Sequence, residues 1–274
     1  MYQNYWQLQS SPFNNDSDTR FYFASDTHQS GLLKLRYLVE NRREAGLLVG
    51  GTGLGKTYLL AALAEQLAET HGPFVRVVFP QLSAPELLAY VAVELGADPS
   101  QVGGSAGGLD RTIREFQRLL TASAEKGRHP VLTIDEAHLI DDPAVFHALR
   151  LLLNFHQQRP DFTLILAGQR ELLTHVRRYA EFEERLAVKC LLRPFNLEET
   201  VGYISSRLAA AGARRPIFEP VAITTIFEVS GGIPRRINRI CDLALLVGFA
   251  EESASISADQ VEAVAAELTA AVPD

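Results

Sequence analysis

Residues 50–57 read Gly50-Gly51-Thr52-Gly53-Leu54-Gly55-Lys56-Thr57, between an apolar run at 46–49 and a segment with helical periodicity. The pattern G-x-x-x-x-G-K-[ST] is typical of a loop that binds phosphate groups. Glycines let the backbone turn tightly and aim its N–H groups inward, and the helix that follows adds the positive end of its dipole. The string therefore predicts a polyphosphate site at the end of a strand.

Two side chains of this loop have distinct expected roles. Lys56 would reach the outer phosphates as a point charge, and Thr57 would give its hydroxyl to a Mg²⁺ ion that bridges them. We expect contacts to the polyphosphate along the whole of 50–58, which includes Tyr58.

A second motif lies at 131–138, where Val-Leu-Thr-Ile-Asp-Glu-Ala-His is an apolar strand that ends in two acids, the Walker B form. A strand that is apolar on both faces suits the interior of a parallel sheet, and it delivers its last carboxylate to the edge where nucleotides bind. Asp135 would then hold Mg²⁺ through water, and Glu136 would polarise the water that attacks the terminal phosphate. The alternative interpretation is that both acids cap the next turn.

The composition indicates a folded protein of 274 residues with an ordinary apolar share of 47% and a net charge of -7. This acidic balance argues mildly against a broad electrostatic contact with nucleic acid. Cys190 and Cys241 lie among apolar neighbours, so no disulfide framework is expected. The sequence has no signal peptide pattern and no apolar run near eighteen residues, which predicts a cytoplasmic protein without a transmembrane segment.

Apolar strands alternate with amphipathic helices over the middle of the chain, which predicts an α/β fold with a parallel sheet sandwiched by helices. The strands are expected at 46–50, 73–79, 130–135, 162–168 and 187–192, and the helices at 27–43, 55–70, 84–95, 109–125, 143–157 and 171–184. Residues 102–108 contain four glycines and predict a surface loop. After Pro194 the pattern is helical only, at 197–211, 219–229, 234–250 and 257–270, which predicts a small all-helical lid.

These patterns divide the chain into three expected parts: an aromatic-rich lead-in and helix at 1–45, a nucleotide-binding α/β domain at 46–194, and the helical lid at 195–274. The aromatic rings of the first 30 residues would pack onto the domain, or some of them would line the base and sugar of the nucleotide.

Taken together, the phosphate loop, the Walker B strand and the helical lid resemble the AAA+ class of P-loop ATPases. Three further strings resemble the ExeA (GspA) ATPases of general secretion: the opening Met-Tyr-Gln-Asn-Tyr-Trp-Gln-Leu-Gln-Ser-Ser-Pro-Phe, residues 164–172, and Gly-Ile-Pro-Arg-Arg-Ile-Asn at 232–238. The likeness covers essentially the whole chain. It extends, less closely, to the transposition ATPases of the TniB kind.

The resemblance implies roles for three more residues. Gln169 matches the polar sensor that orients the attacking water, and Arg235 matches the second sensor, an arginine of the lid that touches the terminal phosphate. Arg185 is placed like an arginine finger that enters a neighbouring subunit's site, although Arg177 and Arg178 could serve instead.

This sequence departs from the family pattern at two positions. Tyr58 stands where small or hydroxyl residues are commoner, which should leave Mg²⁺ binding intact and alter the packing behind the loop. His138 stands where the secretion ATPases often have glutamine. The resulting Asp-Glu-Ala-His matches a helicase box by letters, but 274 residues are too few for paired helicase motor domains.

The resemblance implies an ATP-hydrolysing assembly motor or switch that forms nucleotide-dependent homo-oligomers and serves secretion, pilus or exopolysaccharide machinery. Envelope function would pass through a membrane-protein partner. The alternatives are a DNA-binding transposition adaptor of the TniB type and a nucleotide-binding scaffold that hydrolyses poorly. The intact set of Lys56, Thr57, Asp135 and Glu136 argues against the scaffold.

Overall fold

The computed structural model describes residues 1–14, 18–67, 70–103, 108–154 and 161–270, and the chain forms two compact units. The helical unit comprises Met1–Asp26, Gly53–Tyr58 and Arg193–Asp274, and the sheet unit comprises Thr27–Thr52 and Leu59–Leu192. Each unit has its own apolar core.

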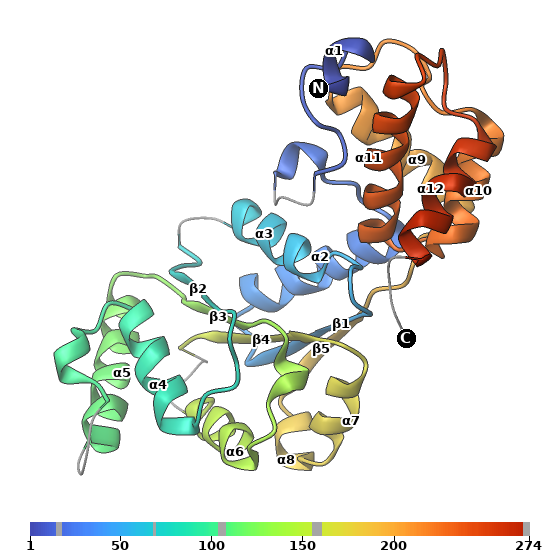
Figure 1. Ribbon diagram of the computed structural model, residues 1–274. Helices are drawn as coiled ribbons and strands as arrows, with labels where there is room; N and C mark the ends of the chain where they lie inside the picture. The colour runs from blue at the N-terminus through green and yellow to red at the C-terminus, as the bar shows by residue number, and fades with distance from the viewer. Residues whose placement is uncertain (15–17, 68–69, 104–107, 155–160, 271–274) are drawn as a thin grey trace. The chain divides into compact units, whose positions relative to one another are not determined.

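The sheet unit is built on five parallel strands in the order β2-β3-β4-β1-β5 (Figure 1). The strands are β1 (Ala45–Val49), β2 (Phe74–Val77), β3 (Val131–Ile134), β4 (Thr163–Gly168) and β5 (Leu186–Leu191). The three inner strands β1, β3 and β4 are buried along their whole length, as their continuous apolar sequences predict. Because β4 lies between β1 and β3, the three strand ends that carry the predicted motifs are neighbours at one edge.

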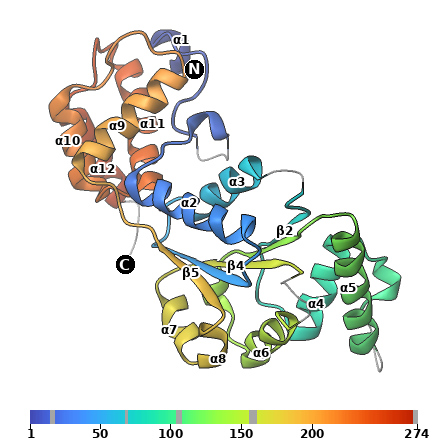
Figure 2. The same cartoon turned by 180° about the vertical axis from the view of Figure 1, so that it is seen from behind.

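Helices cover both faces of this sheet (Figures 1 and 2). One face carries α2 (Asp26–Glu40) and α3 (Lys56–Gln66), and the other carries α4 (Ala84–Glu94), α5 (Gly108–Glu125), α6 (Pro143–Leu152), α7 (Glu171–Arg177) and α8 (Ala180–Glu183). α2 packs closely over β1, where a Cβ atom at Gly46 would lie 2.7 Å from Leu38 and 2.8 Å from Val188. The expected α/β sandwich is confirmed.

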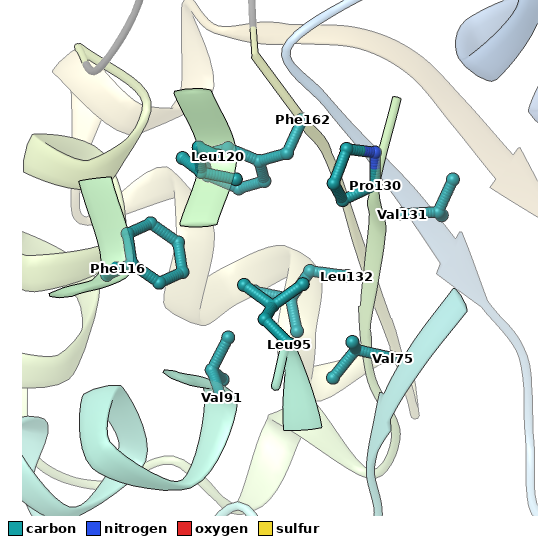
Figure 3. A pocket seen from close by; sticks show the side chains of 9 residues that line it. All are labelled: Val75, Val91, Leu95, Phe116, Leu120, Pro130, Val131, Leu132 and Phe162. Atoms are coloured by element: carbon teal, nitrogen blue, oxygen red, sulfur yellow. The ribbon is translucent and has the colours of Figure 1, made fainter. Parts of the chain in front are cut away.

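The core between the sheet and α4 and α5 is filled by apolar side chains (Figure 3). It retains a gap of about 10 Å³, close to the smallest space that holds one water molecule. The gap is lined by Val75, Val91, Leu95, Phe116, Leu120, Pro130, Val131, Leu132 and Phe162. Its size and apolar lining exclude it as a nucleotide site.

The helical unit contains α1 (Tyr2–Tyr5), the short 3₁₀ turn η1 (Thr19–Phe21), α9 (Leu197–Ala210), α10 (Pro220–Ser230), α11 (Pro234–Ala250) and α12 (Ala258–Ala270). Aromatic residues of the first 26 positions are buried in its core, among them Trp6, whose Nε1 donates to the carbonyl of Leu245 at 2.9 Å. Arg207 is buried as well, donating to the hydroxyl of Tyr203 at 2.9 Å and lying over the ring of Phe21. The aromatic lead-in therefore packs with the C-terminal helices.

The expected elements are present, but several bounds differ. The helix expected at 55–70 ends at Gln66, with residues 68–69 outside the described ones, and the strand expected at 73–79 spans Phe74–Val77. The helical segment expected at 171–184 is two helices, α7 and α8, separated at Arg178 and Tyr179. The end of the helix expected at 143–157 and most of the loop expected at 102–108 lie outside the described residues.

Candidate functional site

The phosphate loop leaves the end of β1 and turns directly into α3. At its start, the N–H of Gly50 donates to the carbonyl of Gly168 at the end of β4, at 3.1 Å. Gly53 and Gly55 have φ angles of 78° and 84°, a left-handed backbone that side chains disfavour. α3 begins at Lys56, so its first N–H groups belong to the loop residues that the motif assigns to phosphate. Lys56 and Leu54 are buried, and Thr57 is half-buried.

Tyr58, one of the two departures from the family pattern, packs against the lead-in within the helical unit. Its ring stacks on Tyr22 with centroids 5.7 Å apart and an interplanar angle of 8°. Its hydroxyl donates to the carbonyl of Asp18. The side chain therefore connects the start of α3 to the aromatic N-terminal segment.

Arg235 lies next to the loop in the same unit. Its backbone N–H donates to the carbonyl of Gly53 at 3.3 Å. A Cβ atom at Gly53 would lie 2.9 Å from Cβ of Arg235, so the absence of a side chain at Gly53 permits this close approach. The exposed Arg235 side chain begins in the first turn of α11, two residues from the N-cap Ile233.

Asp135 and Glu136 follow β3 at the carboxyl edge of the sheet. Asp135 is 2% exposed, and its Oδ1 accepts from the N–H of Glu136 at 3.0 Å. Its Oδ2 accepts from Nη2 of Arg76 on β2 at 2.8 Å. Glu136 has φ 49° and ψ 34°, a left-handed conformation that is costly for a residue with a side chain and that clusters at functional sites. Its side chain is 43% exposed, and a carboxylate that activates a water molecule must be accessible to solvent.

Gln169 directly follows β4 and therefore lies at the same edge, between the strand that carries the loop and the strand that carries the acids. Its Nε2 lies 3.0 Å from Nε2 of His138. His138 belongs to the 3₁₀ turn η3 (Ala137–Leu139), and its Nδ1 lies 3.4 Å from Oε2 of Glu136. The imidazole thus lies between Gln169 and Glu136.

Arg185 lies at the opposite, amino edge of the sheet, directly before β5. Its Nη1 donates to Oε1 of Glu44 at 3.1 Å and its Nη2 to Oδ1 of Asn154 at 2.6 Å. Arg177 and Arg178 are exposed at the end of α7. The role of Arg185 toward a neighbouring subunit stays a prediction, and it requires this side chain to exchange its partners within the chain.

The structure brings together two groups of predicted residues. In the sheet unit the start of the loop, Asp135, Glu136 and Gln169 share one edge, and in the helical unit Gly53 adjoins Arg235. Sequence reasoning missed the contacts of Arg76 and His138. The signal for Arg76 was a charge inside an apolar strand, and the signal for His138 was its departure from the family pattern.

A family model described as "AAA domain" matches residues 39–175. The chain belongs to the AAA domain family. Over 273 residues this AAA protein is 32% identical to "General secretion pathway protein A" of Aeromonas hydrophila, a match that covers 98% of the chain and 49% of the relative. The chain thus spans about half the length of that relative. The resemblance to ExeA-like AAA+ proteins is confirmed.

Solved structures of other AAA+ proteins share the fold of this AAA domain protein. The ORC2 protein of Aeropyrum pernix, solved as ADPNP and ADP complexes, has a TM-score of 0.70 at 17% identity, over 94% of this chain and 73% of that one. The RuvB Holliday junction branch migration motor of Thermotoga maritima has a TM-score of 0.62 at 19% identity, over 94% and 74%. These identities support the fold alone. Among the described residues, no helix is both long and apolar enough to cross a bilayer.

Proposed function

We propose that this AAA domain protein binds ATP at residues 50–58 and hydrolyses it, with Glu136 as the general base. The observation that carries the proposal is the common carboxyl edge of β1, β4 and β3. The loop begins there after β1, Gln169 lies after β4, and the two acids lie after β3. Ligands of open parallel sheets bind at the carboxyl ends of the strands. This edge supplies the start of the phosphate loop after β1, the amide of Gln169 after β4, and one buried and one half-exposed carboxylate after β3.

The donor set at this site fits Mg²⁺, which prefers oxygen ligands and keeps several waters. Thr57 would supply a hydroxyl and Asp135 a carboxylate, whose two oxygens retain lone pairs beside the contacts to Arg76 and Glu136. When bound, Mg²⁺ would neutralise charge on the β- and γ-phosphates.

Each of the site residues has a separate role in the proposed hydrolysis. Glu136 accepts a proton from the attacking water while the water oxygen bonds to the γ-phosphorus. The bond from that phosphorus to the bridging oxygen breaks, and the electron pair leaves with ADP. Lys56 and Arg235 stabilise the charge on the phosphate oxygens, and Gln169 orients the water.

A nucleotide-dependent homo-oligomer would complete the site with an arginine from the next subunit, for which Arg185 is our first choice. Hydrolysis would then change subunit contacts, as expected of an assembly motor or switch. The similarity to General secretion pathway protein A favours secretion machinery as the process served. ATP-dependent, salt-sensitive binding to duplex DNA would instead favour the transposition adaptor of the TniB type.

The decisive experiment separates binding from turnover. Glu136→Gln should bind ATP as tightly as the wild type in calorimetry, while phosphate release falls at least about 100-fold. Lys56→Ala should lose ATP binding, and Glu171→Gln on α7 is the matched control with full turnover. Wild-type turnover in Glu136→Gln would remove Glu136 from its proposed role, and absence of ATP binding by the wild type would end the proposal. Sedimentation of Glu136→Gln with and without ATP tests the oligomer.

A further inference from the structure

His138 connects two residues that the proposed chemistry treats as separate. Nε2 of its ring lies 3.0 Å from Nε2 of Gln169, and Nδ1 lies 3.4 Å from Oε2 of Glu136. The side chain of His138 is 10% exposed, so water contributes little to its orientation. The ring is therefore held mainly by protein groups, of which Gln169 and Glu136 are polar side chains beside its two nitrogens.

The chemistry of the amide fixes where the ring carries its hydrogen. In the structure the amide nitrogen of Gln169 faces Nε2 of His138, and because this nitrogen donates and does not accept, Nε2 is the acceptor in this placement of the amide. The hydrogen of the neutral ring then lies on Nδ1, the nitrogen that faces Glu136. Within the described residues, Nδ1 is buried and makes no hydrogen bond at its present distance.

A buried N–H without an acceptor is costly, and the half-exposed carboxylate of Glu136 is the anion beside it. A small movement of Glu136 would shorten the 3.4 Å separation to a charge-assisted hydrogen bond. The direction of donation then runs from Gln169 through His138 to Glu136.

Two backbone features make this arrangement possible. A Cβ atom at Gly168 would lie 3.1 Å from the backbone nitrogen of His138 and 3.3 Å from Nδ1, so the bare end of β4 leaves room for the ring. The left-handed conformation of Glu136 turns the chain into η3 immediately after β3, which places Glu136 and His138 on the same short turn. Such strained residues persist where the surrounding structure determines them.

We propose that His138 is a positioning residue, which orients the carboxylate of Glu136 through Nδ1–H and is itself held in that tautomer by Gln169. The sensor at the end of β4 and the base at the end of β3 are thereby coupled through one imidazole. The effect on turnover rests on the proposed hydrolysis by Glu136, whereas the tautomer of the ring does not.

The first test reads the tautomer directly and needs no turnover. Ring ¹⁵N NMR of the full chain, with His138 assigned by comparison with His138→Gln, should show hydrogen on Nδ1 at about pH 8, above the ordinary histidine pKa. Gln169→Ala should shift His138 toward the Nε2–H form. Hydrogen on Nε2 in the wild type, or an unchanged tautomer in Gln169→Ala, would overturn the proposal.

The second test measures the coupling in ATP turnover. His138→Leu should lower kcat about 10- to 100-fold with KM changed less than about 3-fold, the usual effect of losing a partner that orients an active group. His138→Gln should restore most of kcat, because an amide both donates and accepts. The double variant His138→Leu/Gln169→Ala should be no slower than Gln169→Ala, since both changes break one chain of contacts.

A purely structural role for His138 gives a different pattern. His138→Leu would then lower the urea midpoint with kcat unchanged in the folded fraction, which would contradict the proposal. A lowered kcat whose effect simply adds to that of Gln169→Ala would contradict it as well. His175→Gln on α7 is the matched control and should leave kcat unchanged. A wild type without ATP turnover would refute the proposed function, and the NMR result would still decide whether Gln169 holds His138 in the Nδ1–H form.

Discussion

Arg76 on β2 forms an ion pair with Asp135 at the end of β3, with Nη2 and Oδ2 2.8 Å apart. The carboxylate side chain is 3% exposed and the arginine side chain 37%. The two strands pair in register with Arg76 opposite Thr133, so the guanidinium reaches along the sheet to its carboxyl edge. The carboxylate proposed for Mg²⁺ therefore already has a cation beside it.

We predict that Arg76→Met destabilises the folded chain by about 2 kcal/mol, because it leaves the buried Asp135 without a charged donor. Arg114→Met is the matched control, since Arg114 and Asp110 form an exposed pair on α5, and it should cost less than about 1 kcal/mol. Urea unfolding at neutral pH measures both changes. Equal midpoints for the two variants would show that the Arg76 pair contributes no more than a surface pair.

The sequence was sufficient to predict the strands and helices that position the site. The apolar runs that became β1, β3 and β4 are buried on both faces, and continuous apolar sequence is the signature of such strands. The order of the strands was not predicted, because pairing depends on contacts between distant segments. The position of β4 between β1 and β3 is what brings Gln169 beside His138.

The contacts of single polar residues were the least predictable part. Arg185 pairs with Glu44, which is 141 positions away, and Arg76 pairs with Asp135 across 59 positions. No local periodicity encodes such pairs. The packing of the lead-in with the C-terminal helices, through Trp6 and Leu245, is equally nonlocal because these residues are 239 positions apart.

The left-handed conformation of Glu136 gives a second prediction. Glu136→Gly should be more stable than Glu136→Ala by about 1 kcal/mol, because glycine adopts φ 49° without the steric cost of a Cβ atom. At Glu115, inside α5, the order should reverse by about 0.5–1 kcal/mol, since glycine is unfavourable in a helix. Chemical denaturation of the four variants tests this. The same order at both positions would contradict the strained backbone at Glu136.

Two adjacent glycines before α11 should differ sharply in their tolerance of a side chain. A Cβ atom at Gly232, where φ is 68°, would lie 2.0 Å from the carbonyl oxygen of Phe195. Gly232→Ala should therefore cost more than about 3 kcal/mol, from the clash and the left-handed backbone together. At Gly231 φ is 61°, but no described atom lies within 4 Å of such a Cβ, so Gly231→Ala should cost only about 1–2 kcal/mol.

Thermal and urea unfolding of the two alanine variants measure this difference. Phe195 also donates its N–H to the carbonyl of Gly232 at 2.9 Å. The clash would displace Phe195 and so break this hydrogen bond as well. Similar midpoints for Gly231→Ala and Gly232→Ala would contradict the close approach of Phe195.

His129 should make the sheet unit sensitive to acid. The ring is 1% exposed and its Nε2 donates to Oγ1 of Thr163 at 2.8 Å, which in turn donates to the carbonyl of Arg43. Burial, with a smaller contribution from the charge of Arg42, lowers the pKa of His129 from 6.5 to about 4. Below about pH 6.5 the unfolded chain therefore takes up a proton that the folded chain does not. The contribution of His129 to the free energy of unfolding is therefore fully present above about pH 6.5. It is lost as the pH falls toward 4, and the loss amounts to about 3 kcal/mol.

His129→Gln removes this titration and keeps an N–H donor for Thr163, so its free energy of unfolding should depend less on pH between about 6.5 and 4 than that of the wild type. The difference between the two curves isolates His129 from the carboxylates, which titrate in both proteins. His147→Gln, at an exposed position on α6, is the matched control and should follow the wild-type curve. Urea unfolding at a series of pH values provides the measurement. Parallel curves for wild type and His129→Gln would show that the imidazole takes up its proton as readily in the folded chain as in the unfolded chain.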